Sequence, residues 1–270
     1  MTGRESEHAS GPESASGYLL SVVIPTRNEA ATAPLLITRL NEALTGISAQ
    51  LIFVDDSDDN TPDVVRGCSE ASSISIELIH REGAARRGGL STAAVAGIRA
   101  AAGEYVCIMD ADLQHPPHLV NSLLKRAEET GADIVIASRY VRGGSDEGLG
   151  GPSRKVISRA AKWLAKAAFF ERIHSVKDPL SGFFLVRRSV LNKATLRPIG
   201  FKILLDILIR SEWTGIQEVP LQFASRAGGV SKATMKQGKD YLLHVLSLFW
   251  HARFDSPARR FRRSPNSERL

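Results

Sequence analysis

The sequence is poor in cysteine and lacks a long apolar run, and both features narrow its class. Among 270 residues only Cys68 and Cys107 are cysteines, too few and too far apart for the disulfide framework of a small secreted domain. Both thiols are therefore expected to be reduced, as in a cytosolic protein. No stretch reaches the roughly 18–20 apolar residues that a membrane-spanning helix needs. The nearest approach, 241–250 (YLLHVLSLFW), is expected either in the core or along a membrane interface.

The two ends of the chain differ from its middle. Residues 1–17 are rich in Ser, Gly and Glu and lack an apolar segment, which predicts a disordered tail rather than a signal peptide. Residues 253–270 carry six arginines against two acidic side chains. Such a basic tail is either a solvated end or a contact for an anionic partner, a membrane surface or a nucleic acid. The chain is 43% hydrophobic, enough for residues 18–252 to form one domain with a sizeable core.

Apolar runs and helical patterns alternate through the first 140 residues. Runs rich in β-branched side chains that end at a polar or turn residue predict buried strands. The segments between them have the apolar spacing of helices. This alternation predicts an α/β fold, with helices on both faces of a mostly parallel sheet. Strands are expected at 18–26, within 50–63, at 73–81, 105–109 and 132–140, and helices at 28–44, from 61, at 90–103 and at 118–131.

Three of these strands end in acidic or amide side chains. The carboxyl ends of parallel strands meet at one edge of a sheet, and ligands bind there. One polar strand end would mean little, but three predict a shared site. The residues are Asn28 and Glu29, Asp55 and Asp56, and Asp110 and Asp112.

Asp110 and Asp112 stand one residue apart at the end of the apolar run 105–109. Two carboxylates this close repel each other unless a cation lies between them. Mg²⁺ and Mn²⁺ prefer oxygen ligands and commonly share coordination with substrate phosphates. The pair therefore predicts a metal–diphosphate site, which Gln114 and His115 complete or orient. Helix capping by Asp112 is the structural alternative, and it would account for one aspartate but not for both.

The chain changes character after residue 140. The five glycines of 141–155 predict a mobile loop. The next segment, 154–172, has a helical spacing that separates a basic face from an apolar face. It is either an ordinary surface helix or a helix lying on anionic lipid headgroups. The basic face holds Lys155, Arg159, Lys162 and Lys166, and the apolar face holds Val156, Ala160, Trp163, Ala167 and Phe170.

Six motifs, several of which contain the residues above, follow one another along residues 18–250. They are VVIPTRNE, FVDDSDDNT, GEYVCIMDADLQHPP, IASRY, DPLSGFFLVRR and EVPLQFASRAGGVSK. A lone D-x-D is a weak signal, but this ordered set resembles the family 2 glycosyltransferases. The polyprenyl-phosphate (dolichyl-phosphate) mannose synthases are the closest match. The resemblance implies a GT-A (Rossmann-like) fold and Mg²⁺ or Mn²⁺ as cofactor. It also implies inverting transfer of a mannosyl group from GDP-mannose to a polyprenyl phosphate.

The resemblance implies roles for individual residues. The nucleotide sugar would be bordered by Pro25, Asn28, Glu29, Asp56, Ala111 and Lys232. The metal would be held by Asp110, Asp112 and Gln114. The acceptor phosphate would contact Arg139, Arg154, Ser158, Arg226 and Ser231. The catalytic residues would be Asp110, Asp112, Arg139 and Arg154, and a segment near the donor sugar would contain Asp178, Ser181 and Gly182.

The acceptor chemistry suggests an enzyme without an essential general base. An alcohol acceptor normally needs one, but a phosphate monoester with a second pKa of about 6 is already a nucleophile at neutral pH. Its difficulty is repulsion from the donor diphosphate, which arginine forks and a metal neutralise. We therefore expect Arg154→Ala to lower turnover sharply and Asp178→Asn to keep the structure and some activity.

Two features depart from the family pattern. Some relatives carry C-terminal transmembrane helices, whereas this sequence ends in arginines soon after SLFWHARF. We therefore expect peripheral binding at the cytoplasmic face of a membrane, through 155–171, 241–250 and the basic tail, or through a membrane-anchored partner subunit. In addition, Pro152 stands where relatives often carry an aromatic residue before the arginine.

Two other functions stay open. The same reaction with UDP-glucose, or with an N-acetylhexosamine donor, fits the motifs equally, because base and sugar contacts depend on loop geometry. The alternative of another class is a non-catalytic protein that docks on membranes or binds nucleic acid through its basic surfaces. It gives no reason for acidic strand ends to converge, since acidic clusters repel phosphate backbones. No nucleic-acid partner is therefore expected.

Overall fold

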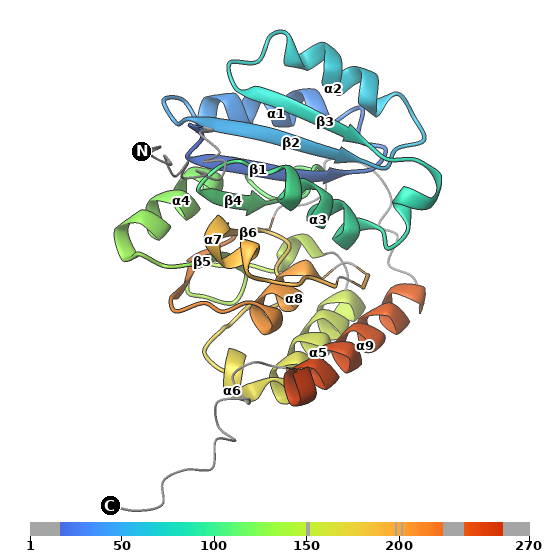
Figure 1. The fold of residues 1–270 in the computed structure, drawn as a ribbon, viewed down its shortest axis with the longest axis vertical. Helices are drawn as coiled ribbons and strands as arrows, with labels where there is room; N and C mark the ends of the chain where they lie inside the picture. The colour runs from blue at the N-terminus through green and yellow to red at the C-terminus, as the bar shows by residue number, and fades with distance from the viewer. Residues whose placement is uncertain (1–16, 150–151, 198, 201, 224–234, 256–270) are drawn as a thin grey trace, which may run out of the picture.

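The computed structural model describes residues 17–149, 152–197, 199–200, 202–223 and 235–255. The expected N-terminal tail (1–17) lies outside these ranges except for its last residue, and the expected basic tail (253–270) except for its first three. Residues 224–234 also lie outside them. The described ranges thus fall mainly within the expected domain, 18–252, and are drawn in colour in Figure 1.

Within the described residues, seven strands form one central sheet (Figure 1). The strand order is β3-β2-β1-β4-β6-β5-β7. Strand β6 runs antiparallel to its neighbours β4 and β5, and the other pairs are parallel. This confirms the α/β fold with a mostly parallel sheet. The strands are β1 (Leu20–Thr26), β2 (Ala49–Asp55), β3 (Ser75–His80), β4 (Tyr105–Ile108), β5 (Ile134–Ser138), β6 (Phe184–Arg187) and β7 (Ile216–Pro220).

Helices cover both faces of the sheet. Successive side chains of a strand point to opposite faces. In β1, Val22 and Ile24 accordingly pack in the core with α1, α2 and α4, while Val23 packs in the core with α3 and α8. The helices are α1 (Ala33–Ala43), α2 (Thr61–Ser69), α3 (Leu90–Ala100), α4 (Leu119–Thr130), α5 (Pro152–Ala168), α6 (Phe170–Ile173), α7 (Arg188–Asn192), α8 (Ile203–Arg210) and α9 (Met235–Trp250), with short turns η1 (Gly83–Arg86), η2 (Glu147–Leu149) and η3 (His251–Asp255).

Helix α3 approaches the sheet closely because it is built from small residues. A Cβ atom at Gly97 would overlap Val23 of β1 and would lie 3.1 Å from Val54 of β2. The close approach brings the first turn of α3 to the end of β3, where Thr92 accepts a hydrogen bond from Arg81 at 3.1 Å. The small-residue pattern thus helps to shape the site edge of the sheet.

Helices α5 and α9 lie side by side at one end of the molecule (Figure 1). The Tyr241 hydroxyl of α9 donates a hydrogen bond to the Ala161 carbonyl of α5 at 2.6 Å. The helix expected at 154–172 is interrupted at Phe169, a buried residue between α5 and α6 that leaves the helical conformation (φ −127°). Along the described part of the chain, no helix has the length and hydrophobicity to cross a membrane.

The glycine-rich segment after β5 is tied to its surroundings more than the sequence suggests. Ser145 forms a bridge to Gln222. Asp146 pairs with Lys155 at 3.7 Å and with Arg159 at 3.2 Å. Helix α5 begins at residue 152, inside the expected loop, because proline suits the first turn of a helix. The expectation of a loop throughout 141–155 was therefore wrong at its C-terminal end.

Candidate active site

The carboxyl ends of β1, β2 and β4 meet at one edge of the sheet. In the parallel ladders Thr26 lies opposite Asp55, and Val23 lies opposite Ile108. The antiparallel β6 brings its amino end to the same edge, since Phe184 pairs with both Ile108 and Ile136. The segment that precedes β6, 178–183, therefore reaches the edge where the three polar strand ends lie.

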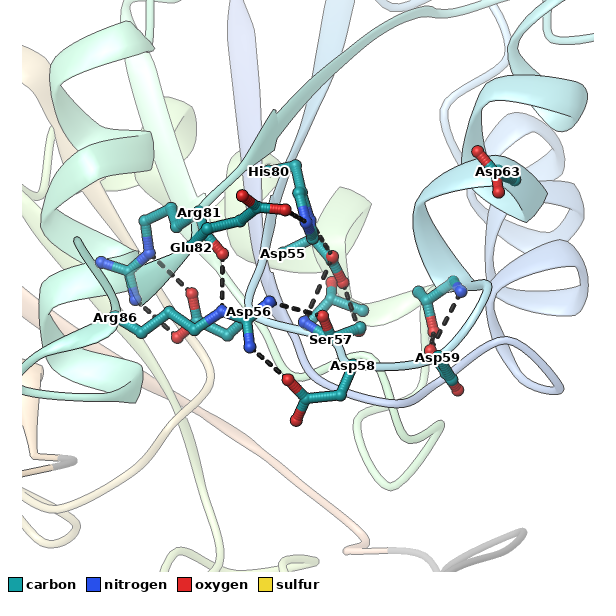
Figure 2. A network of polar contacts seen from close by, with 12 residues as sticks. Asp55, Asp56, Ser57, Asp58, Asp59, Asp63, His80, Arg81, Glu82 and Arg86 are labelled. Atoms are coloured by element: carbon teal, nitrogen blue, oxygen red, sulfur yellow. Dashed lines mark hydrogen bonds and ion pairs between the residues drawn. The ribbon is translucent and has the colours of Figure 1, made fainter. Parts of the chain in front are cut away.

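Charged side chains hold the turn after β2 (Figure 2). Asp55 is fully buried, and its carboxylate accepts the Ser57 N–H at 3.2 Å and contacts His80 Nδ1 at 2.7 Å. Asp56 accepts hydrogen bonds from Arg81 Nε at 2.7 Å and Nη2 at 2.6 Å. A bidentate pair of this kind fixes the plane of both groups. Asp55 thus stabilises the turn, and Asp56 is held rigidly at its rim.

Asp58, an exposed side chain, adds further ion pairs to this network (Figure 2). It pairs with Arg86 and, at 3.3 Å, with Arg27. The hydrogen bond from Arg86 is the main cause that lowers the pKa of Asp58. The carboxylates of Asp55, Asp56 and Asp58 therefore all have cationic or histidine partners, which makes this acidic stretch a poor metal site.

Asn28 and Glu29 fasten the loop after β1 to the turn after β2. Asn28 has a left-handed backbone (φ 57°), which asparagine tolerates better than most residues. Its N–H donates to Ser57 Oγ at 2.7 Å, and its Oδ1 accepts the Asp58 N–H at 2.9 Å. The Glu29 N–H donates to the first residue of α2 at 3.0 Å, and Pro25 is buried in β1. Asn28 and Glu29 therefore lie beside the turn after β2, with Pro25 in the strand beneath them.

Asp110 and Asp112 lie in a tight turn between β4 and α4. Leu113 takes a positive φ of 61°, and Asp112 Oδ1 accepts the Gln114 N–H at 3.1 Å. The Asp110 side chain is 34% exposed, whereas Asp112 is only 4% exposed. Asp112 therefore stabilises the turn, but it does not cap α4, whose N-cap position is His118. A carboxylate accepts several bonds through two oxygens, so this bond leaves a ligand role open.

His115 supports Asp110 from the protein interior. Its Nδ1 accepts the Asp110 backbone N–H at 3.0 Å. The imidazole stacks on Phe183, with ring centroids 5.0 Å apart, and lies 5.6 Å from the Phe223 ring. Burial lowers the pKa of His115, and only a neutral ring accepts at Nδ1. Gly182 lies against both side chains, because a Cβ atom there would be 3.3 Å from His115 Cε1 and 3.4 Å from Asp110 Oδ2.

The turn after β4 suits a hard divalent cation. Groups of three or more His, Cys, Asp or Glu side chains that could hold a metal do not occur in the described ranges. A metal here would be held by Asp110, Asp112 and the amide oxygen of Gln114, whose Nε2 donates to the Gly148 carbonyl at 3.2 Å. Mg²⁺ and Mn²⁺ accept such an oxygen set and share it with phosphates. Ala111 is buried between the two aspartates.

Arg139 and Asp178 form a buried ion pair beyond the end of β5. Arg139 Nε and Nη2 donate to the two Asp178 oxygens at 2.8 Å each. Glu218 in turn accepts the Asp178 N–H at 3.0 Å. The guanidinium carbon of Arg139 lies 5.3 Å from the Tyr140 ring and 5.9 Å from the Phe223 ring. The Phe223 ring therefore touches both this pair and the His115 imidazole.

Lys202 joins the same region from the start of α8. Its Nζ donates to the Leu180 carbonyl at 3.0 Å. Burial, and next the charge of Arg139, lower the pKa of Lys202 to about 8. Sequence reasoning missed this residue. The available signal was a lysine directly before the apolar helix that begins ILLDILI.

Ser158 lies on α5 beside Tyr140, the residue that follows Arg139 in the chain. Its hydroxyl is 3.5 Å from the Tyr140 hydroxyl. The structure therefore brings Arg139 and Ser158 into one region. Arg154 lies one turn earlier on α5, but its side chain is outside what the structure describes. Outside the described residues altogether are Arg226, Ser231 and Lys232.

Sequence reasoning also missed the cations that balance the aspartates after β2. Arg81 and Arg86 follow β3 in the stretch HREGAARRGG. A signal was present, because neighbouring parallel strands end at the same edge. A basic stretch after one strand and an acidic stretch after its neighbour predict an ion-pair network there.

The sequence matches the profile described as Glycosyl transferase family 2 over residues 21–195. It is 40% identical over 239 residues to a dolichol-phosphate mannosyltransferase of Pyrococcus furiosus, a match that covers 87% of this chain and 65% of that relative. The chain thus spans just under two thirds of that relative's length. Relatives of the same name from Mycosarcoma maydis and Saccharomyces cerevisiae are 34% and 32% identical, with 91% and 85% of this chain and 84% and 86% of the relatives covered.

Among solved structures, the fold is similar to glucosyl-3-phosphoglycerate synthase from Mycobacterium tuberculosis in complex with Mn²⁺, UDP-glucose and phosphoglyceric acid. The TM-score is 0.63 at 21% identity, over 87% of this chain and 80% of that one. The same protein in complex with UDP alone gives a TM-score of 0.63 at 22% identity, over 87% and 81% of the two chains. Identities this low show the fold alone. The TM-scores confirm the expected GT-A architecture.

Proposed function

Because the chain belongs to glycosyl transferase family 2, as the sequence motifs predict, we propose that it transfers a mannosyl group from GDP-mannose to a polyprenyl phosphate of the dolichyl type. The products would be polyprenyl-phosphate mannose and GDP, with inversion at the sugar. The names of the three relatives support the sugar and the acceptor. Within the structure, the proposal is carried by one observation. The Asp110–Asp112 turn and the Arg139–Asp178 pair lie at one sheet edge, joined by the Phe223 ring.

On the donor side, the loop after β1 and the turn after β2 would border the nucleotide. Asn28 and Glu29 line this surface, and Asp56, held by Arg81, would present a fixed carboxylate edge to the base or ribose. Asp110, Asp112 and Gln114 would hold Mg²⁺ or Mn²⁺, which when bound would neutralise the diphosphate as it leaves. The same choice of metal is supported by the Mn²⁺ in the fold neighbour. Pro25, Ala111 and Lys232 keep the nucleotide-side roles predicted from the motifs.

On the acceptor side, Arg139 and Ser158 would bind the phosphate together with Arg154. Asp178 engages Nε and Nη2 of Arg139, whereas no hydrogen bond among the described residues uses Nη1. The ion pair would therefore orient the guanidinium and leave one amino group to donate to the phosphate. Arg226 and Ser231, outside the described residues, remain predicted contacts of the same phosphate.

The residues of this chain would then act by positioning and charge neutralisation. The acceptor phosphate, with its second pKa of about 6, needs no base to become a nucleophile. Asp178 would orient Arg139 rather than take a proton, because both its oxygens already accept charge-assisted hydrogen bonds. His115 would hold the backbone of Asp110, and the buried rings of His115 and Phe183 would exclude water from the reacting groups.

Exposed apolar side chains support peripheral binding to a membrane surface. Helices α5 and α9 are adjacent (Figure 1). Large apolar side chains that stay exposed gather on them, and such a surface is typical of an interfacial contact. Basic residues of α5 would meet anionic headgroups beside it. The exposed side chains are Val156, Ile157, Trp163, Leu164, Leu242, Leu243, Leu246, Phe249 and Trp250, with Phe170 in α6.

We place this surface, as part of the same proposal, at the cytoplasmic face of the membrane. A polyprenyl phosphate has its chain in the bilayer and its phosphate at the headgroup level. Since Ser158 lies on α5, the helix that would touch lipid also carries an expected phosphate contact. A membrane-anchored partner subunit is the alternative to direct lipid contact, and the basic tail at 253–270 would contribute to either.

A donor screen tests the reaction. Purified protein is incubated with a short polyprenyl phosphate and GDP-mannose, UDP-glucose or a UDP-N-acetylhexosamine, with and without Mg²⁺ or Mn²⁺, and the lipid product is identified by mass spectrometry. The proposal predicts a mannosyl lipid that requires metal. A glucosyl or N-acetylhexosaminyl lipid would keep the site assignment but replace the donor.

The non-catalytic alternative is tested by thermal melting. Metal-dependent protection by GDP would support the enzyme. Salt-sensitive DNA binding without any nucleotide effect would support a nucleic-acid-binding protein instead.

A further inference from the structure

Tyr140 connects β5 to α5 through three polar groups. Its ring lies 3.6 Å beneath Lys162 Nζ and 5.3 Å from the guanidinium carbon of Arg139. Its hydroxyl is 3.5 Å from Ser158 Oγ. Ser158 and Lys162 are four residues apart in one helix, so they lie on the same face. That face is turned towards Tyr140 and Arg139.

Lys162 differs from Arg139 and Arg159 in how its charge is balanced. Arg139 is paired with Asp178, and Arg159 of α5 is paired with Asp146 at 3.2 Å. Lys162 has no carboxylate within ion-pair distance among the residues that the structure describes, and its ammonium group instead rests on an aromatic ring. A cation–π contact attracts a cation but does not neutralise it.

The surroundings of Lys162 make its charge costly unless an anion binds. Burial is the main cause that lowers the pKa of Lys162, and the charges of Lys166, Arg159 and Arg139 lower it further, against the opposing effect of Asp178. Arg139 and Arg159 have carboxylate partners, so among these four groups only Lys162 and Lys166 have no ion pair with a described residue. Positive charge of this kind attracts an anion. A phosphate monoester carries up to two negative charges at neutral pH.

We propose that Lys162 is a further ligand of the acceptor phosphate, a second cation that faces Arg139 across the Tyr140 ring. Tyr140 would position the ammonium group, and Ser158 would donate to the same phosphate. Arg139 would contribute its Nη1 group from the sheet, and Lys162 would contribute from α5 a positive charge that no described carboxylate balances. This inference rests on the proposed function, because the acceptor is the lipid phosphate named there.

The test compares Lys162→Met and Lys162→Arg with Lys193→Met in the full chain, assayed in a neutral detergent. Lys193 is exposed and follows α7, at the opposite sheet edge, because β6 runs antiparallel. The steady-state KM values for the short polyprenyl phosphate and for the nucleotide sugar are measured. Lys162→Met should raise the acceptor KM about tenfold or more, the usual effect of losing a charge-assisted hydrogen bond. The donor KM should stay unchanged, Lys162→Arg should recover most of the loss, and Lys193→Met should behave as wild type.

A binding experiment separates phosphate recognition from packing. Calorimetric titration with farnesyl phosphate and with farnesol compares the same apolar chain with and without the anion. Lys162→Met should lower the affinity for farnesyl phosphate about tenfold and leave the affinity for farnesol unchanged. An unchanged affinity for farnesyl phosphate, or an equal loss for both ligands, would overturn the role of Lys162. If the wild-type protein transferred no sugar at all, the proposed function would fail, but this titration would still decide whether Lys162 binds phosphate.

Discussion

Arg139 Nε and Nη2 donate to the two oxygens of the buried Asp178 carboxylate at 2.8 Å each. Two substitutions separate an orienting role of Asp178 from a proton-accepting one. Asp178→Asn keeps the shape and one acceptor oxygen, so we expect a folded protein with reduced but measurable turnover. Asp178→Ala leaves Arg139 without its buried partner and should lower the free energy of unfolding by about 3–5 kcal/mol.

Denaturant unfolding and steady-state kinetics of both variants check this prediction. Glu77→Gln, on the edge strand β3, serves as a control carboxylate away from the site edge. If Asp178→Asn abolished turnover while equilibrium binding of the nucleotide sugar and of the polyprenyl phosphate stayed normal, Asp178 would act as a general base and its orienting role would be wrong.

Gly182 leaves little room beside the expected metal ligand. Its Cβ position lies 3.3 Å from His115 Cε1 and 3.4 Å from Asp110 Oδ2. Gly182→Ala should therefore displace the Asp110 carboxylate slightly and raise the metal concentration needed for half-maximal activity. Overpacking should cost about 1–3 kcal/mol of stability.

Gly67→Ala in α2 is the matched control, because no atom lies within 4 Å of its Cβ position. It should leave the metal requirement unchanged. A Gly182→Ala protein with wild-type metal dependence would show that Asp110 does not need this clearance.

Trp163 on α5 and Trp250 on α9 are 68% and 62% exposed. If these helices contact lipid, replacing both tryptophans with serine should lower partitioning onto anionic liposomes about tenfold or more. Burial of a large apolar side chain contributes about 1.5–3 kcal/mol, and each substitution removes that contribution. Flotation measures the bound fraction. Leu35→Ser on α1, where the leucine is 44% exposed, is the control and should bind as wild type.

Removal of residues 254–270 tests the basic tail in the same assay. The tail acts electrostatically if the truncated protein binds more weakly than the full chain at low salt and this difference disappears at high salt. Equal binding without the tail would assign the contact to the helices alone.

The two cysteines should differ in reactivity. Cys107 is fully buried in β4, and burial raises the pKa of its thiol. Cys68 in α2 is only partly buried. Since the thiolate is the reactive form, iodoacetamide should label Cys68 in the folded protein and Cys107 only after unfolding. Peptide mass spectrometry locates the label, and early labelling of Cys107 would contradict the buried position of β4.

Much of the fold could be predicted because the apolar runs are long and clearly bounded. The parallel strands β1, β2, β3, β4 and β5 lie within or close to the predicted ranges. Strand β6 was not predicted, since its four residues, FLVR, have no distinctive period and lie in a segment assigned only by its motif. Its antiparallel direction matters, because it brings Asp178 and Gly182 to the site edge.

The sequence indicated the residue types of the site better than their partners. The pattern around Asp110 and Asp112 predicted a turn at the end of a buried strand, which the structure contains. The pairing of Asp56 with Arg81, and of Arg139 with Asp178, depends on contacts across 25 and 39 positions of chain. Local periodicity carries no information about such contacts. For the same reason the contacts of Tyr140 with Ser158 and Lys162 could not be recognised beforehand.

The proposed function depends above all on the Asp110–Asp112 turn, which would support metal-dependent sugar transfer to a lipid phosphate. Its most direct test measures mannosyl-lipid formation from GDP-mannose with saturating Mn²⁺, in the wild type, in Asp110→Asn combined with Asp112→Asn, and in the exposed-carboxylate control Asp63→Asn. We expect product with the wild type and the control, no product after chelation of the metal, and at least about a hundredfold loss in the double variant. Undiminished product from the double variant, or from chelated wild type, would contradict the proposed role of the turn.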